Sequence, residues 1–289
     1  MKIDLHAHST ASDGTDTPAE LVRHAAAVGL DAVAITDHDG TGGWAEAVAA
    51  LPRGLTLVPG VELSAEHGGV PLHVLGYLID PAYSPLDAEM IAIRDSRVHR
   101  ARRIVEAMAA DGHPVSWERT LARADGAVGR PHIASELVAA GLVPSVSDAF
   151  TDDWIGSNGR YYRAEHKVPA LTAIRLIRDA GGVAVFAHPL ATKRGEVVDE
   201  AAIVAMCEAG LAGLEVDHPD HDDAARARLR SLAADLGLLV TGSSDYHGSR
   251  KPTPLGANMT SPEAYDAIVA AATGTAVVTR ERVNGMDIT

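Results

Sequence analysis

Short apolar runs alternate with helical patterns along most of this chain, and this alternation constrains the fold more than any other feature. It predicts an α/β protein with parallel strands. The Thr17-Pro18-Ala19-Glu20 capping box begins a helix that ends at Gly29. The turn signal His67-Gly68-Gly69 predicts a hairpin between the runs on either side of it. Strands are predicted at residues 2–6, 32–36, 55–58, 72–78, 183–187, 213–216, 238–241 and 276–279, and further helices at 43–50, 91–110, 169–180, 201–209 and 223–236 and after Ser261.

Residues 81–167 interrupt this alternation. An arginine-rich helix at 91–110 is followed by short helical segments with Gly and Pro breaks, and no convincing barrel strand lies among them. We therefore predict a barrel domain formed by residues 1–80 and 168–289. Residues 81–167 are expected to form a mostly helical insertion that covers the substrate.

The composition argues against several functional classes. The formal net charge of -14 argues against broad capture of nucleic acid, because phosphate-binding surfaces are usually basic, and we expect no stable binding of duplexes. No apolar run approaches the roughly 20 residues of a membrane span, and a strand starting at Lys2 leaves no room for a signal peptide. The single cysteine, Cys207, fits a reducing compartment and a structural role. We expect a cytoplasmic protein without membrane partners.

The chain has 14 histidines but only 2 phenylalanines, and the histidines cluster in motifs where predicted strands give way to loops. These motifs are His6-Ala7-His8, Asp37-His38-Asp39, Ala187-His188-Pro189 and Ser244-Asp245-Tyr246-His247, and Glu62 and His73 occupy similar positions. In a barrel, the carboxyl ends of the strands all point to one face, so these residues are expected to converge there. The two histidines of a pair two residues apart on a strand point to the same side and can chelate one cation.

A lone histidine at a strand end is more often a hydrogen-bonded structural residue, and a lone carboxylate is more often solvated. Many such groups at one rim would leave unpaired donors and like charges in the absence of metal. We therefore predict a multinuclear metal site. Its candidate ligands are His6, His8, Asp13, His38, Glu62, His73, His188, Asp245 and His247.

The same motifs resemble those of a known family. Asp4-Leu5-His6-Ala7-His8-Ser9, Ser12-Asp13-Gly14 and Thr36-Asp37-His38, followed in order by Glu62, His188-Pro189 and Asp245-Tyr246-His247, are similar to the polymerase and histidinol phosphatase (PHP) family. Gly129-Arg130-Pro131-His132 and Ala180-Gly181-Gly182-Val183 resemble a narrower bacterial branch. That branch contains nucleoside 3',5'-bisphosphate phosphatases and an exoribonuclease that trims short 5'-phosphorylated RNA.

The resemblance implies a distorted, TIM-like (β/α)7 barrel that holds three divalent metals. It assigns His6, His8, Glu62 and Asp245 to one cation, Glu62, His73 and His188 to a second, and Asp13, His38 and His247 to a third. Nitrogen and oxygen ligands without a thiolate favour manganese, or iron or zinc, over magnesium or calcium. Metal coordination lowers the pKa of bound water. The expected nucleophile is therefore a metal-bridging hydroxide held by Glu62, and no serine or cysteine nucleophile is required.

Substrate contacts are predicted from cations and histidines outside the ligand set. Arg130 and His132 are the leading phosphate contacts, because a guanidinium matches phosphate with two donors, although a surface salt bridge is the alternative for Arg130. His218 and His221 reach the same rim, and either could protonate the leaving oxygen or contact phosphate, or serve only the loop. Arg97 is a weaker candidate, since the arginines of the 91–110 helix spread around it like a solvated face. Arg160 and Lys167, near the end of the insertion, are weaker candidates for contact with a second phosphate or a base.

The resemblance to this branch implies an enzyme that removes the 3'-phosphate from nucleoside 3',5'-bisphosphates. An exoribonuclease acting on short 5'-phosphorylated RNA is the alternative, and both enzymes would use the same hydroxide. The acidic net charge mildly favours the smaller substrate. Histidinol phosphatase fits less well, because the Gly-Arg-Pro-His motif lies in a helical insertion. A metal-binding module without catalysis is disfavoured by the complete ligand set.

Overall fold

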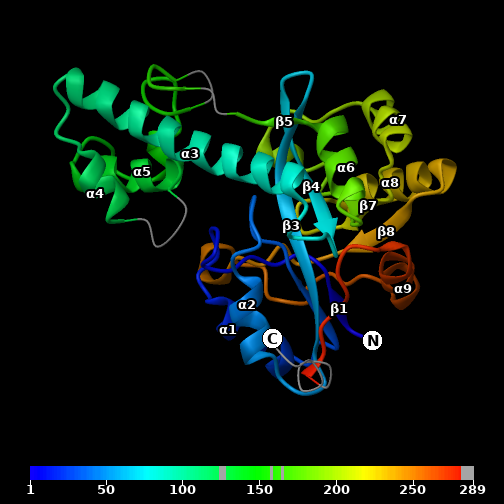
Figure 1. Cartoon of the computed structure of the whole chain (residues 1–289). Helices are drawn as coiled ribbons and strands as arrows, with labels where there is room; N and C mark the ends of the chain where they lie inside the picture. The colour runs from blue at the N-terminus through cyan, green and yellow to red at the C-terminus, as the bar shows by residue number, and fades with distance from the viewer. Residues whose placement is uncertain (124–127, 157–158, 164–165, 281–289) are drawn as a thin grey trace. The chain divides into compact units, whose positions relative to one another are not determined.

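The computed structural model describes residues 1–123, 128–156, 159–163 and 166–280 (Figure 1). Within them the chain forms two compact units. The first consists of Met1–Met90 and Lys167–Thr289, and the second is Ile91–His166.

The first unit is built on a mixed sheet that nearly closes into a barrel. Its strands follow the order β1-β2-β3-β4-β6-β7-β8, and the short strand β5 pairs with β3. A parallel bridge between Ala7 and Tyr246 joins the two edges of this order, where His8 N donates to Tyr246 O at 2.8 Å. The expected seven-stranded, distorted barrel is therefore confirmed. The strands are β1 Ile3–Asp4, β2 Ala32–Ile35, β3 Thr56–His67, β4 Val70–Tyr77, β5 Val168–Pro169, β6 Val183–Phe186, β7 Gly213–Asp217 and β8 Leu239–Gly242.

Two features of the sheet differ from the sequence prediction. The strands are not all parallel, because β3 and β4 form a long antiparallel hairpin and β4 also pairs antiparallel with β6. The hairpin itself was expected from the turn at Gly68 and Gly69, which adopt φ of +60° and +87°. The predicted strand at 276–279 is reduced to a single bridge between Val278 and Leu57.

Helices follow most of the strands and lie around the sheet (Figure 1). The capping box predicted for the first helix is present: Thr17 Oγ1 accepts from Glu20 N, and the Glu20 carboxylate accepts from Thr17 N. The helices of this unit are α1 Pro18–Ala27, α2 Trp44–Ala50, α6 Ala170–Asp179, α7 Glu200–Ala209, α8 Asp223–Leu236 and α9 Pro262–Ala271, with 3-10 turns η2 Thr192–Arg194 and η3 Gly248–Arg250.

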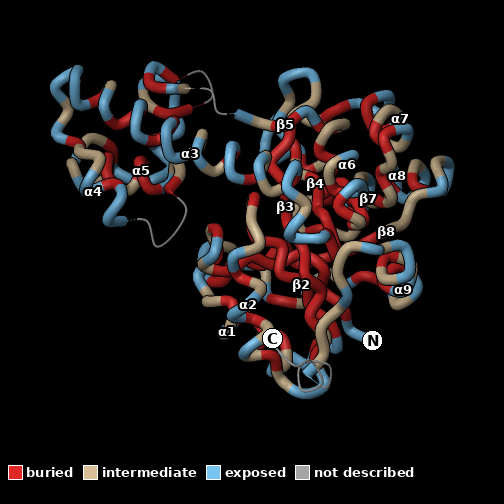
Figure 2. The backbone as a smooth tube through the Cα atoms, in the orientation of Figure 1, coloured by how far each residue is buried: buried red, intermediate tan, exposed pale blue. Residues whose placement is uncertain are grey.

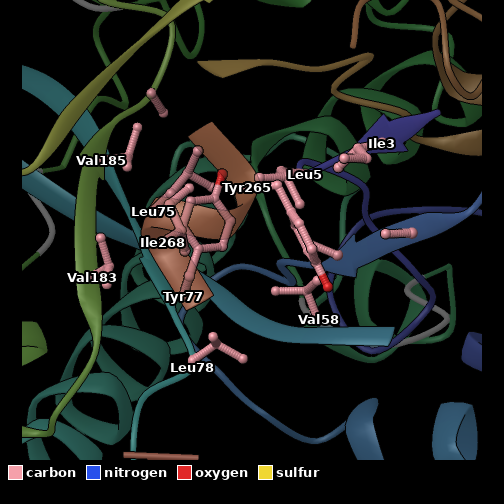
Figure 3. Packing of buried hydrophobic residues seen from close by; sticks show 13 residues of the cluster. Ile3, Leu5, Val58, Leu75, Tyr77, Leu78, Val183, Val185, Tyr265 and Ile268 are labelled. Carbon is pink, nitrogen blue, oxygen red and sulfur yellow. The ribbon is translucent and has the colours of Figure 1, made fainter. Parts of the chain in front are cut away.

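Apolar side chains fill the space between the sheet and its helices. Figure 3 shows Tyr77, Leu75 and Val185 of the sheet beside Tyr265 and Ile268 of α9. Burial of such a side chain stabilises the folded state by about 1.5–3 kcal/mol. The strands are the most deeply buried segments of the unit (Figure 2), so the loops that leave them start from fixed positions.

The second unit is helical within its described residues. Its own core includes Ile104, Met108, Ile133, Leu137 and Tyr161. Its elements are α3 Ser84–Ala110, which begins in the first unit, α4 Trp117–Leu121, α5 Arg130–Ala139 and the 3-10 turn η1 Ser147–Ala149. Helix α3 begins seven residues before the predicted start at 91. That this unit covers the substrate stays a prediction.

Among the described residues, no helix has both the length and the apolar character that a membrane span requires.

Candidate metal centre

Most of the predicted ligands lie where strands end. His6 and His8 follow β1, His38 follows β2, His188 follows β6, and Asp245 and His247 follow β8. Glu62 and His73 are different, because they lie inside β3 and β4 rather than at strand ends. The β3–β4 hairpin extends beyond the rim at which the parallel strands end. Residues in the middle of these two strands therefore lie level with that rim.

Four donor atoms converge at the first part of the cluster. His6 Nε2 and His8 Nε2 lie 3.0 Å apart. Each faces Glu62 Oε2, at 3.2 and 3.1 Å, and Asp245 Oδ1, at 3.4 Å in both cases. All four side chains are buried, with at most 2% exposure.

The second oxygen of Glu62 faces two further histidines. His73 Nδ1 lies 2.9 Å and His188 Nε2 3.1 Å from Glu62 Oε1. His38 Nδ1 approaches the first oxygen, Oε2, at 3.2 Å. Glu62 therefore stands between two groups of nitrogens, as a bridging carboxylate would.

A third group surrounds Asp13. His247 Nε2 lies 3.4 Å and His8 Nδ1 3.6 Å from Asp13 Oδ1, and His38 Nε2 lies 3.9 Å from Oδ2. All nine predicted ligands are thus brought together. The structure groups them with more overlap than the resemblance implies, because His8 stands near both Asp245 and Asp13, and His38 near both Glu62 and Asp13.

The donor atoms fit divalent cations. Ligands about 2.1 Å from one ion, at tetrahedral or right angles, lie about 3.0–3.4 Å from one another. The atoms around His6 and His8 show these separations. His38 Nδ1 and His73 Nδ1 are buried and close to Glu62, yet among the described residues neither makes a hydrogen bond. Nitrogens that approach carboxylate oxygens without hydrogen-bond geometry are arranged for a shared ion.

The charge states of Glu62 and His188 suit the same use, whereas His8 must first lose a proton. Burial raises the pKa of Glu62, but His73, His38 and His6 outweigh it and hold that pKa well below its usual value. Burial lowers the pKa of His188 to about 3, so its ring is neutral. Burial also lowers the pKa of His8, but Asp245 and Glu62 raise it to about 9, so positive charge is favoured at this position and a cation would replace the proton. Ionised carboxylates and neutral imidazoles are the forms that bind metal.

The backbone is strained at three of these loops. Asp39, His188 and Asp245 adopt φ of +53°, +35° and +49°, a region that residues with a Cβ rarely occupy. Such strain costs of order 1–3 kcal/mol per residue and gathers at functional sites. Here the positive φ turns the chain sharply just after β2, β6 and β8, at or directly beside the candidate ligands His38, His188 and Asp245.

A second layer of buried carboxylates, which the sequence analysis missed, holds the ligands in place. Glu215 Oε1 accepts from His6 Nδ1 at 2.9 Å and from the Ser243 hydroxyl, and Oε2 accepts from His188 N at 2.8 Å. This contact leaves His6 Nε2 for the cluster, as in carboxylate–histidine–metal arrangements. The available signal was a lone carboxylate in an apolar strand, which must have a partner when buried.

Asp37 and Asp39 act in the same layer. Asp37 accepts from Ser9 N at 2.8 Å and from the hydroxyls of Ser9 and Ser12, both at 2.7 Å, and so holds the loop after His8. Asp39 accepts from Ser64 N at 2.6 Å and from its hydroxyl at 2.8 Å, and so ties the loop of His38 to β3.

His218 and His221 lie beside the cluster in different ways. His218 Nε2 is 3.3 Å from Asp245 Oδ2, and its Nδ1 accepts from Asp220 N at 3.0 Å. His221 donates from Nδ1 to Val216 O at 2.9 Å and accepts at Nε2 from Leu190 N at 3.1 Å, so both its nitrogens serve the backbone. The catalytic and phosphate-binding roles predicted for them stay predictions.

The remaining substrate candidates are Lys167, in the first unit, and residues of the second unit. Arg130 Nη1 donates to Ile155 O at 3.5 Å and its guanidinium lies 5.6 Å from the Phe150 ring centroid. His132 Nδ1 accepts from Gly129 N at 3.0 Å, and Arg160 pairs with Asp111 at 2.8 Å. Arg97 lies on α3. The substrate contacts predicted for these residues stay predictions.

Known proteins match both the sequence and the fold. The family model for the PHP domain matches residues 4–113. A 3',5'-nucleoside bisphosphate phosphatase of Chromobacterium violaceum is 36% identical over 251 residues, 85% of this chain and 87% of that protein. A 5'-3' exoribonuclease of Haemophilus influenzae is 34% identical over 248 residues, 85% of this chain and 90% of that protein.

Among solved structures, a Bifidobacterium adolescentis protein described as a metal-dependent phosphoesterase superposes with a TM-score of 0.84. The two sequences are 37% identical, and the match covers 94% of this chain and 96% of that one.

Proposed function

Since this chain belongs to the PHP family of metal-dependent phosphoesterases, we propose that it removes the 3'-phosphate from nucleoside 3',5'-bisphosphates. The observation that carries the proposal is the convergence of nine donor side chains, eight in metal-sized groups and His188 beside Glu62, in a chain whose relatives include a phosphatase for this substrate class. The substrate would be a small phosphorylated nucleotide.

The ligand set supports hydrolysis by divalent ions, for which manganese is our first choice and iron or zinc the alternatives. Such ions would supply an activated water and neutralise the phosphoryl oxygens. The chain's own contribution is to hold the donors: Glu62 presents its two oxygens to separate groups of histidines, and Glu215 fixes His6 so that Nε2 faces the cluster.

His218 is our candidate for the proton donor to the leaving oxygen. Its Nδ1 accepts the backbone N–H of Asp220, so its proton must lie on Nε2, which points to Asp245. A histidine N–H that faces the rim of the site is placed to donate a proton to a leaving oxygen. His218 is fully buried, so its ring position is fixed by packing.

Trimming of short 5'-phosphorylated RNA is the second candidate, favoured by the similarity to an exoribonuclease over the same share of the chain. The two activities differ in the phosphate that is attacked, which is a terminal monoester in the bisphosphate and a diester joined to the rest of the chain in RNA. Substrate length therefore separates them.

The deciding experiment measures product release by the manganese-loaded enzyme from adenosine 3',5'-bisphosphate, 5'-phosphorylated di- to pentanucleotides and histidinol phosphate. We expect the highest kcat/KM for the bisphosphate and little turnover of histidinol phosphate. Faster release of mononucleotides from the oligonucleotides would establish the second candidate instead. Preference for histidinol phosphate would refute both.

The site assignment is tested with His8→Ala, which removes a ligand that faces two donor groups. Turnover should be abolished while the far-ultraviolet circular dichroism spectrum stays that of the wild type. His99→Ala is the matched control, because His99 is exposed on α3. Near-normal turnover by the His8 variant would contradict the assignment.

A further inference from the structure

A pocket of about 590 Å³ lies against the metal-ligand cluster in the first unit. Sites for small molecules usually measure about 300–1,000 Å³, so a nucleotide fragment fits this volume. Asp245 and His218 form its inner end, Pro219 and Pro252 contribute apolar wall, and the remaining charged lining consists of Arg194, Asp220 and Lys251.

Two cations meet on the outer oxygen of Asp245. Arg194 Nη2 and Lys251 Nζ each lie 2.6 Å from Asp245 Oδ2. The other oxygen, Oδ1, faces His6 and His8. Arg194 Nε also donates to Asp220 at 2.6 Å.

The charges around this oxygen do not balance once Asp245 serves the cluster. Arg194 and Lys251 bring two positive charges, and Asp220 offsets one of them. The charge of Asp245 can offset the second cation only while no metal ion binds its inner oxygen, Oδ1. When Oδ1 binds a metal ion, the pocket therefore carries net positive charge and attracts an anion.

The two cations are also accessible to a ligand. The side chains of Arg194 and Lys251 are 34% and 32% exposed. Among the residues that the structure describes, Arg194 Nη1 and the second and third Nζ protons of Lys251 have no hydrogen-bond partner. A guanidinium edge and an ammonium side by side match the several acceptor oxygens of a phosphate.

We propose that Arg194 and Lys251 bind the substrate phosphate that is not hydrolysed, which on a nucleoside 3',5'-bisphosphate is the 5'-phosphate. This inference rests on the proposed function, which places the hydrolysed phosphate at the donor cluster. The cations lie on the far oxygen of Asp245, one carboxylate away from the metal-facing donors, and are therefore placed for a second phosphate. Neither residue was expected from the sequence.

The first test compares two substrates, adenosine 3',5'-bisphosphate and adenosine 3'-monophosphate, with the manganese-loaded enzyme. Each charge-assisted contact supports a roughly ten- to hundredfold preference in kcat/KM for the bisphosphate. Arg194→Gln and Lys251→Gln should each reduce that preference by about tenfold or more, mainly through KM for the bisphosphate. Lys193→Gln is the matched control, because it removes a neighbouring exposed cation that does not line the pocket.

The ratio of the two substrates separates this role from indirect damage to the metal site. Loss of metal through Asp245 would slow both substrates together and leave the ratio unchanged. An unchanged ratio in both variants, or a wild-type enzyme without preference for the bisphosphate, would overturn the proposal.

The second test does not depend on turnover. Titration calorimetry with adenosine 5'-monophosphate and with adenosine should show tighter binding of the phosphorylated ligand, and Lys251→Gln should remove most of the difference. Equal binding of the two ligands by the wild type would refute the pocket assignment, even if the bisphosphate is hydrolysed. If adenosine 5'-monophosphate binds as expected but the enzyme does not hydrolyse the bisphosphate, only the proposed reaction is refuted.

Discussion

Replacing Glu215 with glutamine tests how the fold presents His6 to the metal site. The carboxylate only accepts hydrogen bonds, and it accepts three: from His6 Nδ1 at 2.9 Å, from the Ser243 hydroxyl, and from His188 N at 2.8 Å. Glutamine has the same shape but replaces one acceptor oxygen with an NH2 donor. Glu215 is fully buried, so water cannot repair a mismatch.

The amide has two possible orientations, and both are costly. If its nitrogen faces His188, two buried donors oppose each other, and about 1–3 kcal/mol is lost for each. If its nitrogen faces His6, that ring must accept at Nδ1 and carry its proton on Nε2, the atom 3.0 Å from His8 Nε2. The fold then persists, but His6 no longer binds metal. Loss of such an outer partner weakens metal affinity by about 10- to 100-fold.

The assay measures two quantities in parallel: the affinity for manganese, and the free energy of unfolding of the enzyme from which a chelator has removed the metal. Glu215→Gln should show either at least about tenfold weaker manganese binding or a loss of about 2–6 kcal/mol in stability. Glu208→Gln is the control, because Glu208 is exposed on α7 and undergoes the same chemical change. Wild-type values for both quantities in Glu215→Gln would show that the carboxylate does not set the His6 tautomer.

Three further outcomes follow from the structure. Chelation should abolish turnover and lower the melting temperature, and manganese at 100 times its Kd should restore about 2.7 kcal/mol; full activity after chelation would contradict a metal-dependent site. Burial raises the pKa of Glu136, but Arg119 and Arg123 outweigh it and hold that pKa below its usual 4.5. The stability that this carboxylate contributes is therefore complete above pH 4.5 and is lost as the pH falls through the lower pKa of the folded state. Because those arginines are half exposed, Glu136→Gln should remove about 1 kcal/mol or less at neutral pH and flatten the acid limb of the unfolding curve; an unchanged limb would argue against the pair. Gly274→Ala would place a Cβ 2.5 Å from Ala180 O and Asp80 N and should cost about 1–3 kcal/mol or more, whereas Gly42→Ala meets open space and should be neutral in denaturant unfolding. Equal costs would refute the close approach.

The ligand set could be predicted because its logic is local. Residues such as His6, His8 and Asp245 follow short apolar runs, and parallel strands bring their carboxyl ends to one rim. Glu62 and His73 were assigned to the same kind of position, but they lie within a hairpin. The hydrophobic pattern of a strand does not show whether the strand is parallel or antiparallel to its neighbour. The direction of β4 could therefore be predicted only from the turn at Gly68 and Gly69.

The supporting layer could not be predicted in the same way. Glu215 and His6 are 209 residues apart in sequence. Arg194 and Lys251 come together because both donate to the same oxygen of Asp245. Their roles depend on which atoms the barrel brings within hydrogen-bond distance. A charged residue in an apolar strand indicates that a partner exists, but the partner is chosen by strand order and register.

The strained loops connect this supporting layer to metal binding. Asp39, His188 and Asp245 hold positive φ values that cost of order 1–3 kcal/mol each, and the hydrogen bonds of Ser64 and Glu215 hold two of these loops in place. Metal ions bound by the folded rim but not by the unfolded chain would add stability that offsets this strain. The loops should therefore open more readily in the chelated enzyme, while the buried strands beneath them keep their protection. Hydrogen exchange should accordingly show a metal-dependent change at the amides of residues 38–39, 188 and 245, and little change in β2 or β7. A uniform change throughout the first unit would mean that metal binding stabilises the whole barrel rather than the strained loops.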